Sequence, residues 1–217
     1  MLSLFSREGL LGLIVSIPGL LLAISLHEFA HGYAAYLMGD PTAKYSGRLS
    51  LNPLHHLDLM GAICMLLFRF GWAKPVPIDS RYFKNRRAGI ITVSLAGPFA
   101  NFILGFIFCF GYYAIVRFAT PELVIWQFLS QICLYGIFMN VGLMIFNLIP
   151  IPPLDGSKIL MEFLPARIKY RIYSYERYFS LILIIIVYAG VMSPVLGILR
   201  GYVINLYEIV IGTIFFS

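Results

Sequence analysis

The chain has 217 residues, of which 60% are hydrophobic and 12% are charged. Soluble domains have about 45–50% apolar and about 25% charged residues, so this composition excludes a soluble globular protein and indicates an integral protein of the lipid bilayer. The formal net charge of +6 is typical of basic loops on one side of a membrane, and we expect no nucleic-acid partner.

The apolar segments, taken in chain order, predict an all-α polytopic membrane protein with about five transmembrane helices. A spanning helix needs about 20 apolar residues. The first candidate stops at Gly39-Asp40-Pro41, a typical helix-ending sequence. The candidate spans are residues 10–38, 88–118, 123–149, 178–199 and 201–216.

The connection between the first two spans predicts a different kind of structure. Its apolar piece LMGAICMLLF has about 10 residues, too few to cross a bilayer. The flanking sequences YSGRLSL and KPVPI have extended character, and the prolines of the second exclude a helix. We therefore expect a re-entrant or β-like segment over residues 44–80, after the first helix and at the rim of a site. Its strand-like residues 44–78 could bind an extended substrate by edge pairing.

The basic residues predict the orientation of the chain in the membrane. Most of the 16 lysines and arginines lie in residues 40–87 and 158–177. Two predicted spans separate these segments, so both lie on one side, which should be the cytoplasmic side. The N-terminus then starts outside. The segment 158–177, with its interleaved tyrosines, is interpreted as an interfacial anchor or a docking surface for a partner.

The motif HEFAH places three ionisable side chains inside the first predicted span. His27 and His31 are spaced i and i+4, so both imidazoles project from one face of a helix and can reach one metal ion. Glu28 lies beside them, where it could take a proton from water. A polar clasp between helices is the alternative. A carboxylate at the centre of a span costs about +2.5 to +3.5 kcal/mol, and a divalent cation offsets that cost best.

A catalytic zinc site needs a third protein ligand and an open position. His55, His56 and the ten carboxylates are candidates. Asp155 is distinctive because it follows three prolines in FNLIPIPPLDGSKIL, which stop the third span before it leaves the bilayer. Asp155 could instead cap the next helix. Its depth near the cytoplasmic face, similar to that of HEFAH, favours the ligand. The three cysteines are odd in number and are interpreted as buried apolar side chains.

Five motifs occur in the order found in the site-2 proteases: HEFAH, GRLSLNPLHHLD, GWAKPVPI, SLAGPFANF and FNLIPIPPLDG. The sequence resembles the compact bacterial group of this family, the intramembrane zinc metalloproteases of peptidase family M50. The resemblance covers roughly residues 20–160 and implies a three-helix catalytic core within residues 1–160. Residues 161–217 would then add a basic cytoplasmic segment and two C-terminal transmembrane helices.

The resemblance also implies the parts of an active site. His27, His31 and Asp155 would bind one Zn²⁺ per chain, Glu28 would act as general base, and Asn147 would bind substrate or support the transition state. The implied activity is hydrolysis of peptide bonds within or near transmembrane segments of membrane-protein substrates. The implied location is the bacterial inner membrane, multi-pass, with the active site nearer the cytoplasmic face.

Three further residues match family positions without an assigned role. For Asn101 and Asn140, helix packing is at least as good an interpretation as a function. His56 matches a family histidine, and we do not expect it to touch the metal.

Other classes of membrane protein fit part of the pattern. A di-iron oxidase needs more histidines than the four present. A metal-dependent transporter or ion carrier also places histidines, carboxylates and broken helices near the midplane, but we find no internal inverted repeat. The transporter is therefore the alternative to the protease. The sequence leaves the substrate unidentified and is compatible with an oligomer.

Overall fold

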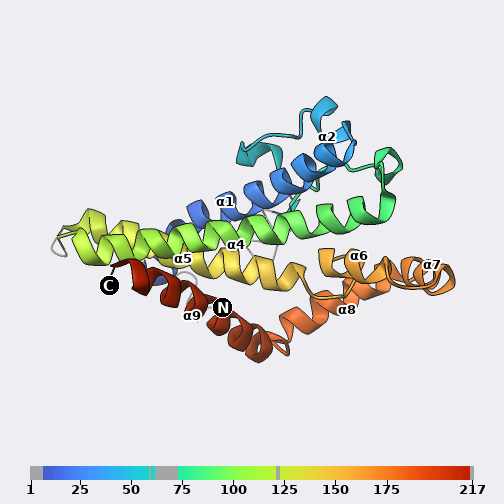
Figure 1. Ribbon diagram of the computed structural model, residues 1–217. Helices are drawn as coiled ribbons and strands as arrows, with labels where there is room; N and C mark the ends of the chain where they lie inside the picture. Colours follow the sequence, from blue (N-terminus) through green and yellow to red (C-terminus); the bar gives the residue numbers. More distant parts are fainter. Residues whose placement is uncertain (1–6, 59, 62–72, 121–122, 216–217) are drawn as a thin grey trace.

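Three long helices that pack against one another form the centre of the fold (Figure 1). The computed structural model describes residues 7–58, 60–61, 73–120 and 123–215. A fourth long helix lies against two of them, on the side of the bundle opposite the first helix in the view of Figure 1. The four helices are α1 (Arg7–Met38), α4 (Arg86–Phe118), α5 (Val124–Asn147) and α9 (Ser193–Phe215).

The first three spans begin and end close to their predicted limits. Helix α1 ends at Met38, directly before the predicted helix-ending sequence Gly39-Asp40-Pro41. Helix α4 begins after Asn85, whose side-chain oxygen accepts a hydrogen bond from the N–H of Ala88 (3.1 Å) and so caps the helix. Helix α5 ends at Asn147, shortly before the prolines that prevent its continuation.

A buried cluster joins α9 to α4 and α5. Cys109 of α4, Ile137 and Val141 of α5, and Tyr207 and Ile211 of α9 belong to it. The hydroxyl of Tyr207 donates a hydrogen bond to the Phe102 carbonyl (2.6 Å). Cys109 is buried, as predicted, whereas Cys133 is only half-buried. Cys64 lies outside the described residues.

The described residues of the connection between α1 and α4 are mostly irregular. Its short elements are α2 (Thr42–Tyr45), η2 (Pro53–His55) and η3 (Ser80–Tyr82). The expected re-entrant piece falls on residue 59 and residues 62–72, outside the described residues. The parts of this connection that the structure describes contain no strand, and the β-like expectation reduces to one antiparallel bridge between Leu57 and Ala73. Residues 74–79 form no regular element.

The predicted count of five spans is not confirmed. Among the described residues, four helices are long and apolar enough to cross a membrane. After α5 come α6 (Asp155–Met161), α7 (Ala166–Ser174) and α8 (Glu176–Tyr188). Helix α8 has 13 residues, or roughly 20 Å, which is shorter than a bilayer core of about 30 Å. It ends in turns over residues 189–192, where Gly190 has a φ of 71°, a conformation that glycine adopts readily.

Helix α9 runs parallel to α4 and antiparallel to α5. Near its start, the guanidinium of Arg200 lies over the Phe138 ring, 5.7 Å from the centroid. At its end, Phe215 contacts Phe110 and Phe118 in the last part of α4. Arg200 separates the fourth and fifth predicted spans in the sequence, but in the structure it lies inside α9. Figure 1 shows α8 and α9 advancing in the same general direction, from the α6–α7 end of the bundle to the end where α4 joins α5.

This path predicts that the end of α9 lies on the same side of the membrane as the α4–α5 connection. Single cysteines at Thr120 and after residue 217 should then react with a membrane-impermeant maleimide from the same side. A cysteine at Lys84 should react from the other side. The measurement compares labelling in intact and in permeabilised spheroplasts, for variants of the protein in which the native cysteines have been replaced. Labelling after residue 217 from the Lys84 side would support five spans instead.

Candidate metal centre and active site

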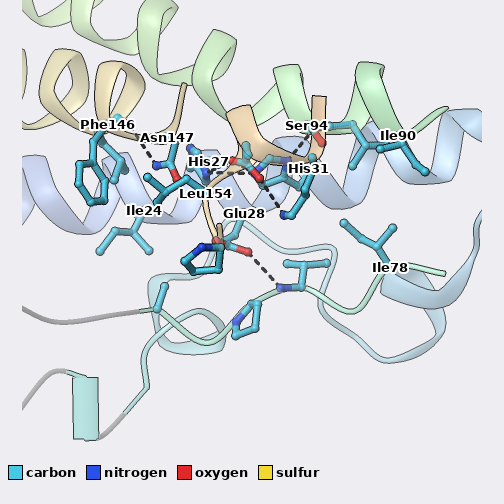
Figure 2. Close-up of a pocket in the computed structure, with 18 of the residues that line it drawn as sticks. Ile24, His27, Glu28, His31, Ile78, Ile90, Ser94, Phe146, Asn147 and Leu154 are labelled. Carbon is cyan, nitrogen blue, oxygen red and sulfur yellow. Dashed lines mark hydrogen bonds and ion pairs between the residues drawn. The ribbon is translucent and has the colours of Figure 1, made fainter. Parts of the chain in front are cut away.

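The turns that follow α5 bring Asp155 to the two histidines of α1. The Oδ2 atom of Asp155 lies 3.0 Å from Nε2 of His31 and 3.3 Å from Nε2 of His27. The two Nε2 atoms lie 3.0 Å apart. Figure 2 shows both rings directed at the same point beneath α4. All three side chains are buried. The structure thus brings the three candidate ligands together in the interior of the protein.

Both imidazoles are oriented by α4 through their other ring nitrogen. Nδ1 of His31 lies 2.7 Å from the carbonyl oxygen of Val93, and Nδ1 of His27 lies 2.6 Å from Oδ1 of Asn101. Both partners can only accept, so each Nδ1 carries the proton and donates it. In the neutral rings, each Nε2 therefore directs a lone pair at the shared point.

The side-chain orientation of Asn101 is fixed by two further hydrogen bonds. Its Nδ2 donates to the Ala23 carbonyl (3.0 Å) and to Oδ1 of Asn140 (2.9 Å), which leaves Oδ1 for His27. Nδ2 of Asn140 in turn donates to the Gly136 carbonyl (2.8 Å). Both asparagines are fully buried. The chain of amides thus links α5 through α4 to the first candidate ligand on α1.

The donor set fits a divalent metal ion. Two imidazole lone pairs and a carboxylate oxygen meet at about 3 Å with no proton between the two nitrogens, an arrangement that is repulsive on its own. The ligand atoms lie within 4.8 Å of one another, close enough to contact one ion. Two nitrogens and one oxygen match a catalytic zinc site with three protein ligands, and the outer hydrogen bonds are those typical of zinc-bound histidine.

The environment of Asp155 keeps its side chain anionic. Burial raises the pKa of this carboxyl, whereas the neighbouring positive charge of Lys158 lowers it and so favours the anion. Nζ of Lys158 lies 2.9 Å from Oδ1, which leaves Oδ2 to face the histidines. The sequence left open that Asp155 caps the next helix. Asp155 is the first residue of α6, but its side chain is directed at the histidines.

Gly97 allows α4 to approach the histidines closely. A Cβ atom at this position would lie 2.4 Å from Nε2 of His31 and 2.7 Å from Cε1 of His27, distances that side chains do not tolerate. Gly97 and Asn101 are spaced i and i+4, so one face of α4 carries both the gap and the hydrogen-bond acceptor.

Glu28 lies between the ligand cluster and the connection that crosses below α1 in Figure 2. Its Oε2 accepts a hydrogen bond from the N–H of Val76 (3.0 Å). Glu28 is half-buried and lines a cavity of about 610 Å³ together with His27, His31, Asp155 and Asn147. The candidate base and the candidate ligands therefore share one cavity.

The other candidates do not join the ligand cluster. Asn147 lines the cavity, and its Nδ2 donates to the Leu143 carbonyl (3.0 Å). His56 is fully buried, with Nε2 donating to the Ser50 carbonyl (2.7 Å), and His55 lies 3.2 Å from the Gly47 carbonyl. The structure thus places Asp155, not His55 or His56, beside the two histidines.

Comparisons with known proteins agree with this geometry. The model of Peptidase family M50 matches residues 114–190. YwhC of Bacillus subtilis (strain 168), which carries the name "Putative zinc metalloprotease", is 36% identical over 201 residues, covering 87% of this chain and 89% of the relative. The chain belongs to peptidase family M50.

Two further relatives of this M50 protein are also named "Putative zinc metalloprotease". Rip2 of Mycolicibacterium smegmatis (strain ATCC 700084 / mc(2)155) is 34% identical over 150 residues, covering 66% of this chain and 54% of the relative. MJ0611 of Methanocaldococcus jannaschii is 28% identical over 158 residues, covering 72% and 74%. No solved structure matches the chain at a significant level.

The sequence did not show which residues form hydrogen bonds with the three candidate ligands of this M50 protein. Asn101 proves to be the hydrogen-bond partner of His27, a role that the sequence left open beside helix packing. Val93 acts through its main chain, and Lys158 binds the free oxygen of Asp155. For Asn101 the sequence signal was the motif SLAGPFANF, where Gly97 precedes it by about one helical turn.

The structure predicts that Asn101 controls metal affinity. Asn101→Leu removes the acceptor for Nδ1 of His27, so the zinc affinity should fall by roughly 10–100-fold. Asn140→Leu disturbs the same buried chain without touching a ligand, and its zinc affinity should fall less than that of Asn101→Leu. Competition with a chelator, on protein purified in detergent, measures both. A wild-type zinc affinity in Asn101→Leu contradicts this role.

Gly97→Ala should force α4 away from α1. Overpacking of this kind costs about 1–3 kcal/mol of stability, and the displaced histidines should also bind zinc less tightly. Gly111→Ala is the matched control in the same helix, because its Cβ would meet only Sγ of Cys133 at an ordinary 3.5 Å. Thermal unfolding in detergent compares the two variants. Equal melting temperatures would argue against close packing at Gly97.

Proposed function

We propose that this M50 protein is an intramembrane zinc endopeptidase, which hydrolyses peptide bonds within or near the transmembrane segments of membrane-protein substrates. The observation that carries the proposal is the shared cavity, where Glu28 lies beside the cluster of His27, His31 and Asp155. That cavity lies among α1, α4 and the end of α5, three helices that form the membrane-embedded core.

Each ligand has a defined role in this proposal. His27, His31 and Asp155 would hold one Zn²⁺ through Nε2, Nε2 and Oδ2. Such an ion would supply Lewis-acid chemistry to the scissile carbonyl and would lower the pKa of bound water to about 7. Asn101 and Val93 hold the two rings with Nε2 facing the site, and Lys158 binds Oδ1 of Asp155 so that Oδ2 faces it.

Glu28 moves the protons of the reaction. Its carboxylate takes a proton from the attacking water as the new C–O bond forms, and then gives a proton to the leaving amine as the C–N bond breaks. Oε2 is held by the N–H of Val76, so Oε1 is the oxygen available for this transfer. Proton transfer by a positioned carboxylate contributes about 10²–10⁴-fold to rate.

Asn147 acts on the substrate rather than on the metal. It is the last residue of α5 and lines the cavity, where its amide can donate to the oxygen that becomes negative during attack. A helical substrate hides its peptide bonds, so the segment to be cut must be unwound before it enters the cavity. The strand-like sequence GRLSL, residues 47–51 earlier in the connection, is the candidate to bind it by edge pairing.

The membrane location follows from the same features. By the positive-inside rule, the basic residues beside α2, η3 and the start of α4, with those of α6 and α7, support a cytoplasmic orientation for the mouth of the site. The membrane of this proposal is the bacterial inner membrane. Helix α7 carries Arg167, Lys169 and Arg171 together with tyrosines, which suits the headgroup region of the bilayer. The partner is a transmembrane protein substrate, and an oligomer is compatible with this arrangement.

Glu28→Gln separates catalysis from metal binding. The variant keeps the three ligands, so it should bind zinc as the wild type does, while cleavage falls by about 10²–10⁴-fold. The probe is a single-span peptide with a fluorophore and a quencher, about 20 apolar residues and a Gly-Pro break near its cytoplasmic end, in detergent micelles. Cleavage at the wild-type rate by zinc-loaded Glu28→Gln would overturn the assignment.

Two further variants divide the remaining roles. Asp155→Asn should lose zinc and activity together, and chelation of the wild type should do the same. Asn147→Ala should keep zinc and lower kcat by about 10²-fold, as loss of one oxyanion donor does elsewhere. Full activity after complete removal of metal would exclude the zinc mechanism.

A further inference from the structure

One main-chain N–H reaches the Glu28 carboxylate from the connection between α1 and α4. The N–H of Val76 donates to Oε2 over 3.0 Å, along the dashed line below α1 in Figure 2. The neighbours of Val76 are Pro75 and Pro77, which have no N–H to offer. This stretch therefore presents a single donor, and that donor faces the candidate base.

Several hydrogen bonds hold the residues before Val76 in place. The N–H of Lys74 donates to the His56 carbonyl (2.9 Å). Nη2 of Arg48 donates to the carbonyls of Lys74 (2.7 Å) and Pro75 (3.2 Å). The segment thus approaches Glu28 with the N–H of Lys74 and the carbonyls of Lys74 and Pro75 already bonded within the connection.

Asp40 holds the residues after Val76. It is fully buried just beyond the end of α1, and its Oδ2 accepts the N–H of Asp79 (2.7 Å). Its Oδ1 accepts the N–H of Thr42 (2.9 Å). Glu28 and Asp40 lie twelve positions apart, roughly 18 Å along the helix axis, so Asp40 ties the helix that carries the base to the segment that orients it.

We propose that residues 73–79 position the Glu28 carboxylate through the N–H of Val76, and that Asp40 is the positioning residue that holds this segment. The inference rests on the proposed function, because orientation of Glu28 matters only if Glu28 is the general base. A glutamate on a helix samples several side-chain rotamers. Fixing Oε2 selects the one that turns Oε1 to the reacting atoms, so the orientation is present before substrate binds.

Val76→Pro removes the N–H, and it also replaces the buried Val76 side chain, a change that the alanine variant below controls for. The zinc-loaded variant should lose about 10–100-fold in kcat on the quenched single-span peptide, with little change in KM. Val76→Ala keeps the N–H and loses only side-chain packing, so its kcat should fall by less than about threefold. A wild-type kcat in folded, zinc-loaded Val76→Pro overturns the proposal, as does an equal loss in both variants.

Asp40→Asn tests the remote tie without changing the shape of the side chain. One of the two carboxylate oxygens becomes an NH₂ group, which cannot accept from Asp79 or Thr42. Hydrogen exchange of the Val76 amide should then rise about tenfold, and kcat should fall with zinc content unchanged. Asp58→Asn is the matched control, because Asp58 also accepts one main-chain N–H, from Gly61 (2.8 Å), within the same connection. Wild-type exchange and kcat in Asp40→Asn overturn the role of Asp40.

The design separates this inference from the proposed function. If Glu28→Gln cleaves the peptide as fast as the wild type, the general-base assignment fails, and the positioning role fails with it. If Glu28→Gln is inactive while Val76→Pro and Asp40→Asn keep the wild-type kcat, only the positioning role fails. Exchange of the Val76 amide in Glu28→Ala reports the hydrogen bond without any substrate, and should rise about tenfold.

Discussion

The repulsion between three electron-rich atoms in a buried place sets the conditions for the whole core. His27, His31 and Asp155 direct two nitrogen lone pairs and a carboxylate oxygen at one point, and a low local dielectric strengthens the repulsion among them. Such a cluster persists only when a cation occupies the point or when the surrounding packing is rigid. Helix α4 provides this rigidity, because Asn101 and the Val93 carbonyl accept hydrogen bonds from the Nδ1 atoms of the two imidazole rings.

The site divides its work between two kinds of structure. The ligands lie on or directly after long packed helices, where side-chain positions vary little. Glu28 lies on a helix but receives its hydrogen bond from an irregular connection. The candidate ligands and the candidate base thus depend on different elements for their orientation. Buried Asp40 holds this connection in place on the other side of Val76.

Local signals made part of this molecule predictable. Apolar runs bounded by a cap or by prolines placed α1, α4 and α5 nearly correctly, and the spacing of His27 and His31 fixed a shared helix face. The partner of His27 was not predictable as such, because Asn101 lies 74 positions along the chain and meets it only after the helices pack. The C-terminal region was harder still. Residues 178–216 are mostly apolar, and the break is marked only by Gly190 and Ser193-Pro194, although membrane helices also contain glycine and proline.

The position of Asp155 in the chain has a consequence for biosynthesis. Ribosomes release α1, with its two histidines and its glutamate, long before Asp155 is made. Until the third span has entered the membrane, the nascent chain holds two ligands and lacks the wall that α4 and α5 form around them. A site that needs all three side chains is therefore incomplete until the third span and the turns after it have been synthesised.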